Sequence, residues 1–121
     1  LATRLSAYND EMKKLASIYR NDTEAQVFYA LTLQASASKA DLTYANQLKS
    51  AAILEKLYER NPQHPGVSHF IIHAYDFAPL ADKGIAAALS ADPHFRRGLN
   101  VADGEIRSEP VARALGLPLR P

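Results

Sequence analysis

The sequence contains no cysteine and no tryptophan, and its glycines and prolines are confined to one part of the chain. The absence of cysteine excludes disulfide bonds, thiolate metal ligands and a cysteine nucleophile, and it leaves the redox compartment undetermined. None of the 5 glycines or 7 prolines precedes Pro62. Residues 1–61 therefore lack both residue types that interrupt a helix, which favours long helices in this half of the chain.

The sequence also lacks an excess of one charge and any long hydrophobic run. Lys and Arg number 14 against 13 Asp and Glu, which gives a formal net charge of +1. Nucleic-acid-binding domains usually concentrate basic residues on one face, so we expect no nucleic-acid partner. No apolar run approaches the roughly 20 residues of a membrane-spanning helix, and no signal peptide is visible, so we expect no membrane partner.

Alanine and leucine dominate the residues that are present. The chain of 121 residues holds 21 alanines and 15 leucines, but valine and isoleucine together number only 10. Unbranched side chains lose little rotamer freedom in a helix, so this composition predicts an all-α fold. The length allows one small domain. Because the chain begins at Leu1 without a methionine, we expect a fragment or a processed product.

The spacing of apolar residues predicts about five helices in antiparallel hairpins. The predicted helices cover residues 5–19, 23–35, 44–60, 67–75 and 80–91. The first carries one apolar stripe, formed by Leu5, Tyr8, Met12, Leu15 and Tyr19. The third places Leu48, Ala51, Leu54 and Tyr58 on its buried side. We expect residues 1–93 to form a helical-repeat domain, and residues 94–121 to form an irregular tail with one small helix that packs on the last helical pair.

Turn and capping residues predict where the helices begin and end. Thr23 and Gln26 have the spacing of a capping box, with a hydroxyl at the first position and an amide three residues later. Asn61 precedes Pro62 and is pushed out of the α region, which ends the third helix. The His64-Pro65-Gly66 sequence predicts a turn before the fourth helix.

Residues 12–84 contain short sequence motifs that are typical of a helical-repeat family. These motifs are AQVFYAL at 25–31, AAILE at 51–55, HPG at 64–66 and HFIIHAYD at 69–76. They resemble a group of bacterial tetratricopeptide-repeat proteins, whose fold is a stack of antiparallel helical hairpins. Stacked helical hairpins leave a concave surface that holds peptides in repeat proteins, so we expect a non-catalytic scaffold that binds a protein or peptide. On this alignment the exposed polar contributors to partner binding are Glu24, Gln34, His69 and His73.

Residues 80–118 contain a second set of short sequence motifs. LADKG at 80–84, RGLNV at 97–101, GEI at 104–106 and VARALGL at 111–117 resemble the C-terminal end of alanine dehydrogenase. In that family this stretch is structural and carries none of the reactive groups. The alternative function is therefore a non-catalytic C-terminal remnant of an alanine dehydrogenase-like, NAD-dependent oxidoreductase. The glycines do not form the dinucleotide-binding pattern, so we expect no enzyme activity and no cofactor.

His69, His73 and Asp76 are the one set of side chains whose spacing suggests chemistry. On a helix all three project from the same face, and imidazoles one turn apart can bind zinc. Phe70 stands where a metalloprotease helix carries its glutamate base, which excludes a hydrolase. We interpret the histidines as packing groups that bond to neighbouring helices and to the Asp76 turn, with metal binding as the alternative. A third possibility is a structural fragment without independent activity, which would self-associate.

Overall fold

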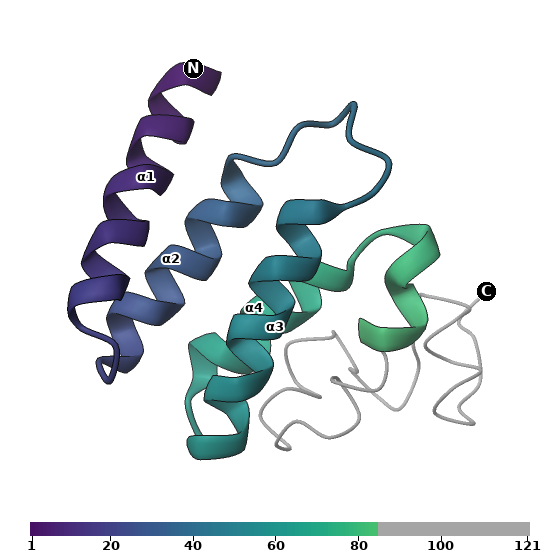
Figure 1. The fold of residues 1–121 in the computed structure, drawn as a ribbon. Helices are drawn as coiled ribbons and strands as arrows, with labels where there is room; N and C mark the ends of the chain where they lie inside the picture. Colours follow the sequence, from purple (N-terminus) through teal and green to yellow (C-terminus); the bar gives the residue numbers. More distant parts are fainter. Residues whose placement is uncertain (85–121) are drawn as a thin grey trace.

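The computed structural model describes residues 1–84, which are helical over most of their length (Figure 1). The elements are α1 (Ala2–Ile18), α2 (Thr23–Ala35), α3 (Ala45–Arg60), α4 (Pro65–Tyr75) and the short 3₁₀ helix η1 (Ala78–Leu80). Residues 81–84 are again helical, and no strand occurs within residues 1–84. The predicted all-α fold is therefore confirmed. The predicted tail at 94–121 and most of the helix predicted at 80–91 lie outside the described residues.

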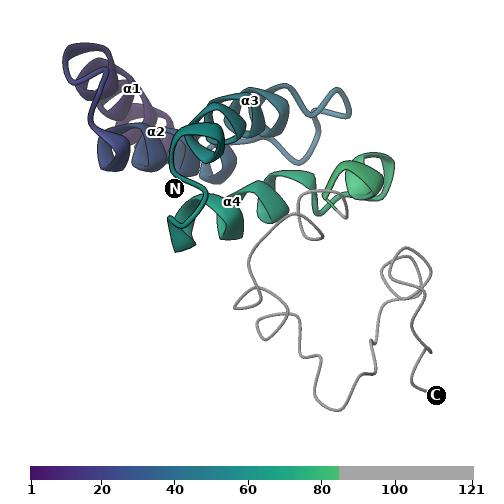
Figure 2. The same cartoon turned by 90° about the horizontal axis from the view of Figure 1, so that it is seen from below.

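Consecutive helices run antiparallel to one another. The chain passes down α1, up α2 and down α3, and α4 then runs up behind α3 (Figure 1). α3 packs against both α2 and α4, whereas α1 packs against α2. α4 also contacts α2 and runs in the same direction as α2. Figure 2 shows α4 in a second layer beneath the first three helices.

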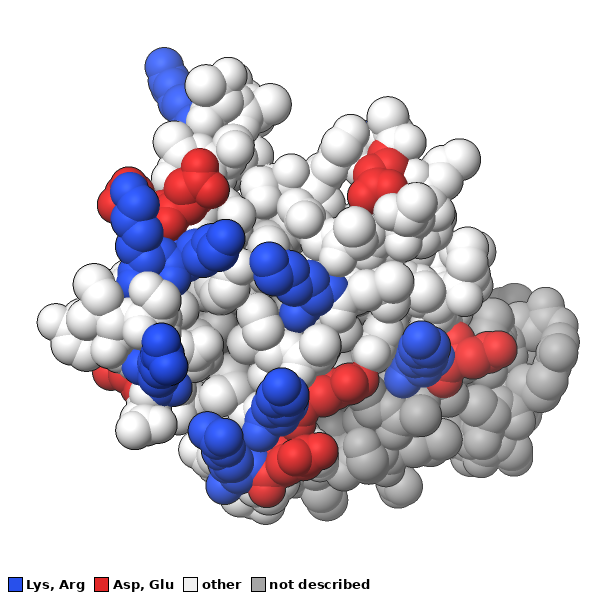
Figure 3. Space-filling model, viewed as in Figure 1, with Lys and Arg blue, Asp and Glu red and all other residues white. Residues whose placement is uncertain are grey.

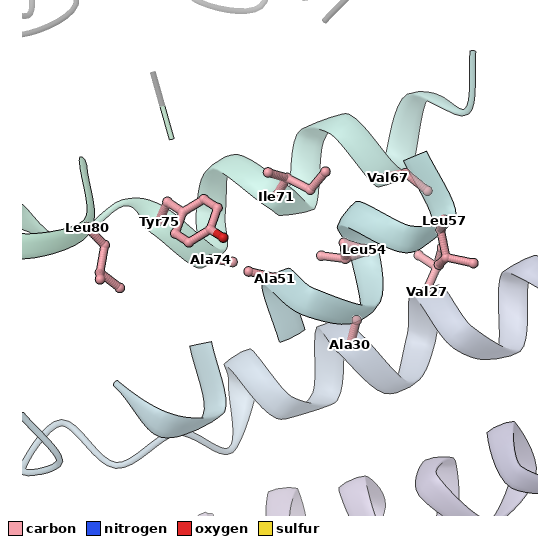
Figure 4. Packing of buried hydrophobic residues seen from close by; sticks show 10 residues of the cluster. All are labelled: Val27, Ala30, Ala51, Leu54, Leu57, Val67, Ile71, Ala74, Tyr75 and Leu80. Atoms are coloured by element: carbon pink, nitrogen blue, oxygen red, sulfur yellow. The ribbon is translucent and has the colours of Figure 1, made fainter. Parts of the chain in front are cut away.

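The main core lies on the two sides of α3 (Figure 4). Ala51 and Leu54 of α3 are fully buried between α2 and α4. The cluster comprises Val27, Ala30, Ala51, Leu54, Leu57, Val67, Ile71, Ala74, Tyr75 and Leu80. Alanines at three of these positions let the helix backbones approach closely, while the branched residues fill the space between them. Burial of this apolar surface is the main force that holds the three helices together.

Tyr75 fixes α4 to α3 at the edge of this core. Its ring is buried, and its hydroxyl donates a hydrogen bond of 2.6 Å to Oε1 of Glu55. Burial, and then the hydrogen bond to Glu55, raise the pKa of Tyr75 to about 12. Gly84 approaches the same residue so closely that a Cβ at position 84 would lie 3.0 Å from the Cβ of Tyr75. The segment after η1 therefore packs directly on the end of α4.

α1 is held less firmly than the other helices. Ala16 is its one buried residue, and it joins Tyr29 and Leu33 of α2 in a small second cluster. The apolar stripe predicted for this helix is therefore buried only in part, because Tyr8, Leu15 and Tyr19 are 50%, 39% and 56% exposed. One neighbouring helix covers only one side of such a stripe. Leu48 of α3, also predicted to be buried, is likewise exposed.

The beginning of α2 differs from the predicted capping box. The N-cap is Asp22, one residue before Thr23, and its Oδ1 accepts a 2.9 Å hydrogen bond from the Ala25 N–H. The Gln26 side chain does not cap α2 and instead donates to the Ala16 carbonyl of α1 at 2.8 Å. A carboxylate three residues before a free N–H is as good a cap as a hydroxyl, and it also complements the helix dipole.

The starts of α3 and α4 also depend on single side chains. Tyr44, the N-cap of α3, is left-handed with a φ of 54°, and Asp41 takes over the capping role. The Asp41 carboxylate accepts hydrogen bonds from the hydroxyl and N–H of Thr43 and from the N–H of Ala45. These hydrogen bonds lower the pKa of Asp41, and the bond from the Thr43 hydroxyl lowers it most.

α4 begins at Pro65, two residues earlier than predicted, because proline suits the first helical position and His64 serves as the N-cap.

The surface of the described part carries both signs of charge. On the face in Figure 3, lysine and arginine side chains alternate with aspartate and glutamate. On this face of residues 1–84 the basic side chains form no continuous patch. None of the helices within residues 1–84 is both long and apolar enough to cross a membrane.

Candidate binding surface and histidine pair

His64 links the beginning of α4 to the beginning of α2. Its Nδ1 accepts a 3.3 Å hydrogen bond from the Val67 N–H, and its Nε2 lies 2.7 Å from Oε1 of Glu24. Because Nδ1 acts as the acceptor, the ring proton is on Nε2 and is donated to the Glu24 carboxylate. The His64 side chain is only 17% exposed and that of Glu24 is 65% exposed. One carboxylate is thus held at the surface by a mostly buried imidazole.

Gln34 has an internal role instead of the exposed one that we expected. Its side chain is half-buried, and Nε2 donates to the Ser50 hydroxyl at 2.7 Å and to the Phe70 carbonyl at 3.0 Å. These three residues belong to α2, α3 and α4. Ser50 is fully buried, so its hydroxyl needs an internal partner, and Gln34 supplies one. Gln34 therefore ties three helices together.

His69 and His73 lie together on the exposed side of α4. Their Nε2 atoms are 3.0 Å apart, and their rings meet edge to face with centroids 4.6 Å apart. His69 also meets the ring of Phe70 edge to face, with centroids 5.3 Å apart. We expected these histidines to bond to neighbouring helices, and within the described region they bond to each other.

Asp76 does not join the two histidines. It is the C-cap residue of α4, one residue beyond the end of the helix. Within residues 1–84, no group of three or more His, Cys, Asp or Glu side chains is placed to hold a metal ion. The structure thus brings together two of the three residues that the sequence grouped.

An open apolar cleft lies between α1 and α2, with a volume of about 340 Å³. That volume is at the lower end of the range of about 300–1,000 Å³ that is typical of ligand pockets. The lining residues are Met12, Leu15, Tyr19, Asp22, Glu24, Ala25 and Phe28. Leu15, Tyr19 and Phe28 are 39%, 56% and 46% exposed, so three large apolar side chains meet solvent at one place.

The charges of this cleft are all of one sign. Two of its seven lining residues are acidic and none is basic. Asp22 is engaged as the cap of α2 and Glu24 faces His64, so both carboxylates are fixed in position by hydrogen bonds. The cleft therefore combines apolar side chains with two carboxylates.

The sequence alone did not single out this cleft. The spacing of Met12, Leu15 and Tyr19 is that of an apolar stripe, which predicts burial against a neighbouring helix. Within residues 1–84 the stripe of α1 is wider than the surface that α2 covers, so part of it is exposed.

Comparisons with known proteins give one short match. No family model matches the chain, and no solved structure matches it. An alanine dehydrogenase from Halomonas elongata is 55% identical to it over 38 residues, which are 31% of this chain and 10% of that enzyme. The chain therefore spans about a tenth of the length of the curated relative that it matches. The resemblance to alanine dehydrogenase is shown for a short segment, and the tetratricopeptide resemblance stays a prediction.

Proposed function

We propose that this chain is a non-catalytic helical-repeat module of tetratricopeptide type that binds a peptide segment of a partner protein. The cleft between α1 and α2 is the observation that supports this proposal. Exposed Leu15, Tyr19 and Phe28 form an apolar surface that a single inserted side chain would cover. Aromatic and aliphatic side chains grouped in a pocket are the usual centre of a binding interface.

The charge of the cleft indicates the chemistry of the partner. A peptide that places an apolar side chain on Phe28 brings its next residues close to Asp22 and Glu24. A lysine or arginine there would pair with carboxylates that are already held in position, which favours it over an acidic residue. The partner that we propose is therefore a segment with one large apolar residue next to a basic residue.

The helix arrangement supports a repeat interpretation. In this proposal α2 and α3 form one hairpin, and α4 begins the next. α2 and α4 are then equivalent first helices, and their direct contact is the one that stacked repeats require. Glu24, His69 and His73 are exposed polar candidates for partner contacts, while Gln34 supports the surface from inside.

Selection from a random peptide library on the immobilised full chain tests the proposal. We expect recovered peptides to share a large apolar residue next to Lys or Arg. Leu15→Ala removes a side chain from the cleft and should abolish enrichment, whereas Leu42→Ala, the same substitution at a 79% exposed site outside the cleft, should not. Recovery of no common sequence, or equal recovery by both variants, would overturn the proposal.

A second copy of the chain is the competing occupant of the cleft. Light scattering at increasing concentration distinguishes the two cases. A monomer without peptide is the expected result. A mass that rises with concentration in the wild type and not in Leu15→Ala would assign the cleft to self-association and contradict the peptide proposal.

The match to alanine dehydrogenase supports a second candidate, a C-terminal remnant of such an enzyme without catalytic activity. The glycines of the chain, at positions 66, 84, 98, 104 and 116, do not form the G-x-G-x-x-G pattern that binds a dinucleotide. We expect no NAD-dependent conversion of alanine or pyruvate by the purified chain. Turnover above that of a buffer control would contradict the non-catalytic assignment in both candidates.

A further inference from the structure

His69 and His73 present two imidazole nitrogens to solvent at one point of α4. They are four residues apart on a helix, which places them on one face on successive turns. Both side chains are exposed, and the Nε2 atoms lie 3.0 Å apart. In this contact one Nε2 carries a proton and the other accepts it through its lone pair. A shift of that proton to Nδ1 of the same ring frees the second Nε2 lone pair, so that both nitrogens can act as ligands.

The distance between the two nitrogens fits a hydrogen bond and is also compatible with chelation of a metal ion. Two imidazole nitrogens about 2.0–2.1 Å from zinc lie about 3.3 Å apart at a tetrahedral angle and about 2.9 Å apart at a right angle. The observed 3.0 Å lies between these values. We propose that His69 and His73 chelate a late first-row divalent cation such as Zn²⁺ between their Nε2 atoms.

Metal binding would exchange the proton between the two rings for a cation, and this exchange involves no oxidation or reduction. The cation takes the place of the proton between the two Nε2 atoms, and each neutral ring then carries its proton on Nδ1. The helix already holds both rings in contact, so little side-chain entropy is lost on binding.

The identity of the cation follows from the ligands. Imidazole nitrogen suits Zn²⁺, Cu²⁺ and Ni²⁺, whereas Mg²⁺ prefers oxygen. Within residues 1–84 no third ligand group joins them, so this part of the chain supplies two ligands. The site is therefore weaker than a four-ligand structural zinc site. It lies on α4 and includes none of the residues that line the α1–α2 cleft, so metal binding can be tested separately from peptide binding.

Thermal unfolding of the full chain with added zinc chloride at neutral pH tests the site. At a free zinc concentration of about 100 times the Kd, the folding equilibrium constant rises about 100-fold, which raises Tm by several degrees. Magnesium chloride at the same concentration should leave Tm unchanged. His69→Ala and His73→Ala should each abolish the zinc response, since one imidazole alone cannot chelate. Gln63→Ala, at an exposed position outside the pair, is the control and should keep it.

The imidazole resonances of the wild type give a second, local measurement. Zinc should shift the ring signals of His69 and His73 and leave those of His64 in place. Unchanged ring signals and an unchanged Tm in zinc would overturn the proposal. A zinc response of equal size in His73→Ala would also overturn it, because the cation would then be bound elsewhere.

Discussion

Nε2 of His64 lies 2.7 Å from Oε1 of Glu24, a residue 40 positions earlier in the chain. The same imidazole caps α4 through its Nδ1. One side chain thus sets both where α4 begins and how that beginning is placed against the first turn of α2. It also holds one of the two carboxylates of the α1–α2 cleft.

Removal of the His64 ring should destabilise the fold more than loss of the Glu24 contact alone. His64→Ala removes the cap and the link, and should cost about 1–2 kcal/mol in urea unfolding. His64→Asn keeps a capping side chain and should cost less. Glu24→Gln should cost only about 0.5 kcal/mol, because the carboxylate is largely exposed. Equal losses for His64→Ala and His64→Asn would show that the cap contributes nothing.

Gln34 should behave as a half-buried polar link to the buried Ser50 hydroxyl. Gln34→Ala leaves the Ser50 hydroxyl without its partner and should lower the free energy of unfolding by about 2–3 kcal/mol. Gln63→Ala, at an exposed position, should change it by less than about 0.5 kcal/mol. A double-mutant cycle with Ser50→Ala measures the coupling directly. If the losses in unfolding free energy of the two single variants simply add in the double variant, the Gln34–Ser50 hydrogen bond makes no contribution.

Leu54 is the largest fully buried side chain of the main core. Leu54→Ala should destabilise the protein by about 2–5 kcal/mol, from lost burial and the cavity that remains between α2 and α4. Leu42→Ala, at a 79% exposed site, is the matched control and should have almost no effect. Similar unfolding midpoints for the two variants would contradict the packing described for α3.

Tyr75 should make stability depend on pH in the alkaline range. Burial and the Glu55 contact raise its pKa from 10.0 to about 12, so the folded protein keeps a proton that the unfolded chain loses. This contribution is complete below pH 10 and is lost as pH rises from 10 to about 12. The loss amounts to at most about 2 kcal/mol, because water reaches the rim of the site.

The Tyr75→Phe variant isolates this effect from the titration of lysines. The difference in unfolding free energy between wild type and variant should shrink steadily over that alkaline range. A constant difference would mean that the hydroxyl titrates alike in the folded and unfolded chains.

The sequence predicted the helices of residues 1–84 well, because helix periodicity and the breakers after residue 61 are local signals. α3 ends at Arg60, as Pro62 requires. The start of α4 was predicted two residues late, because proline and histidine were assigned to a turn although both suit the beginning of a helix.

Burial and side-chain partners were predicted less well, because they depend on which helix lies opposite. Periodicity shows which side of α1 is apolar, but not that a single neighbour leaves Leu15 and Tyr19 exposed. Gln34 is polar, yet the fold gives it two internal acceptors. The spacing of His69 and His73 placed them on one face, and only the side-chain rotamers bring their rings together.

The affinity of a selected peptide for wild type and for Phe28→Ala tests the central claim most directly. Phe28 lines the cleft and is 46% exposed, so its removal takes away contact surface without opening the main core. Fluorescence anisotropy should show at least a roughly tenfold weaker Kd for Phe28→Ala, the equivalent of about 1.4 kcal/mol of lost apolar contact. Leu42→Ala should bind as wild type does. An unchanged Kd in Phe28→Ala would contradict the assignment of the α1–α2 cleft as the peptide site.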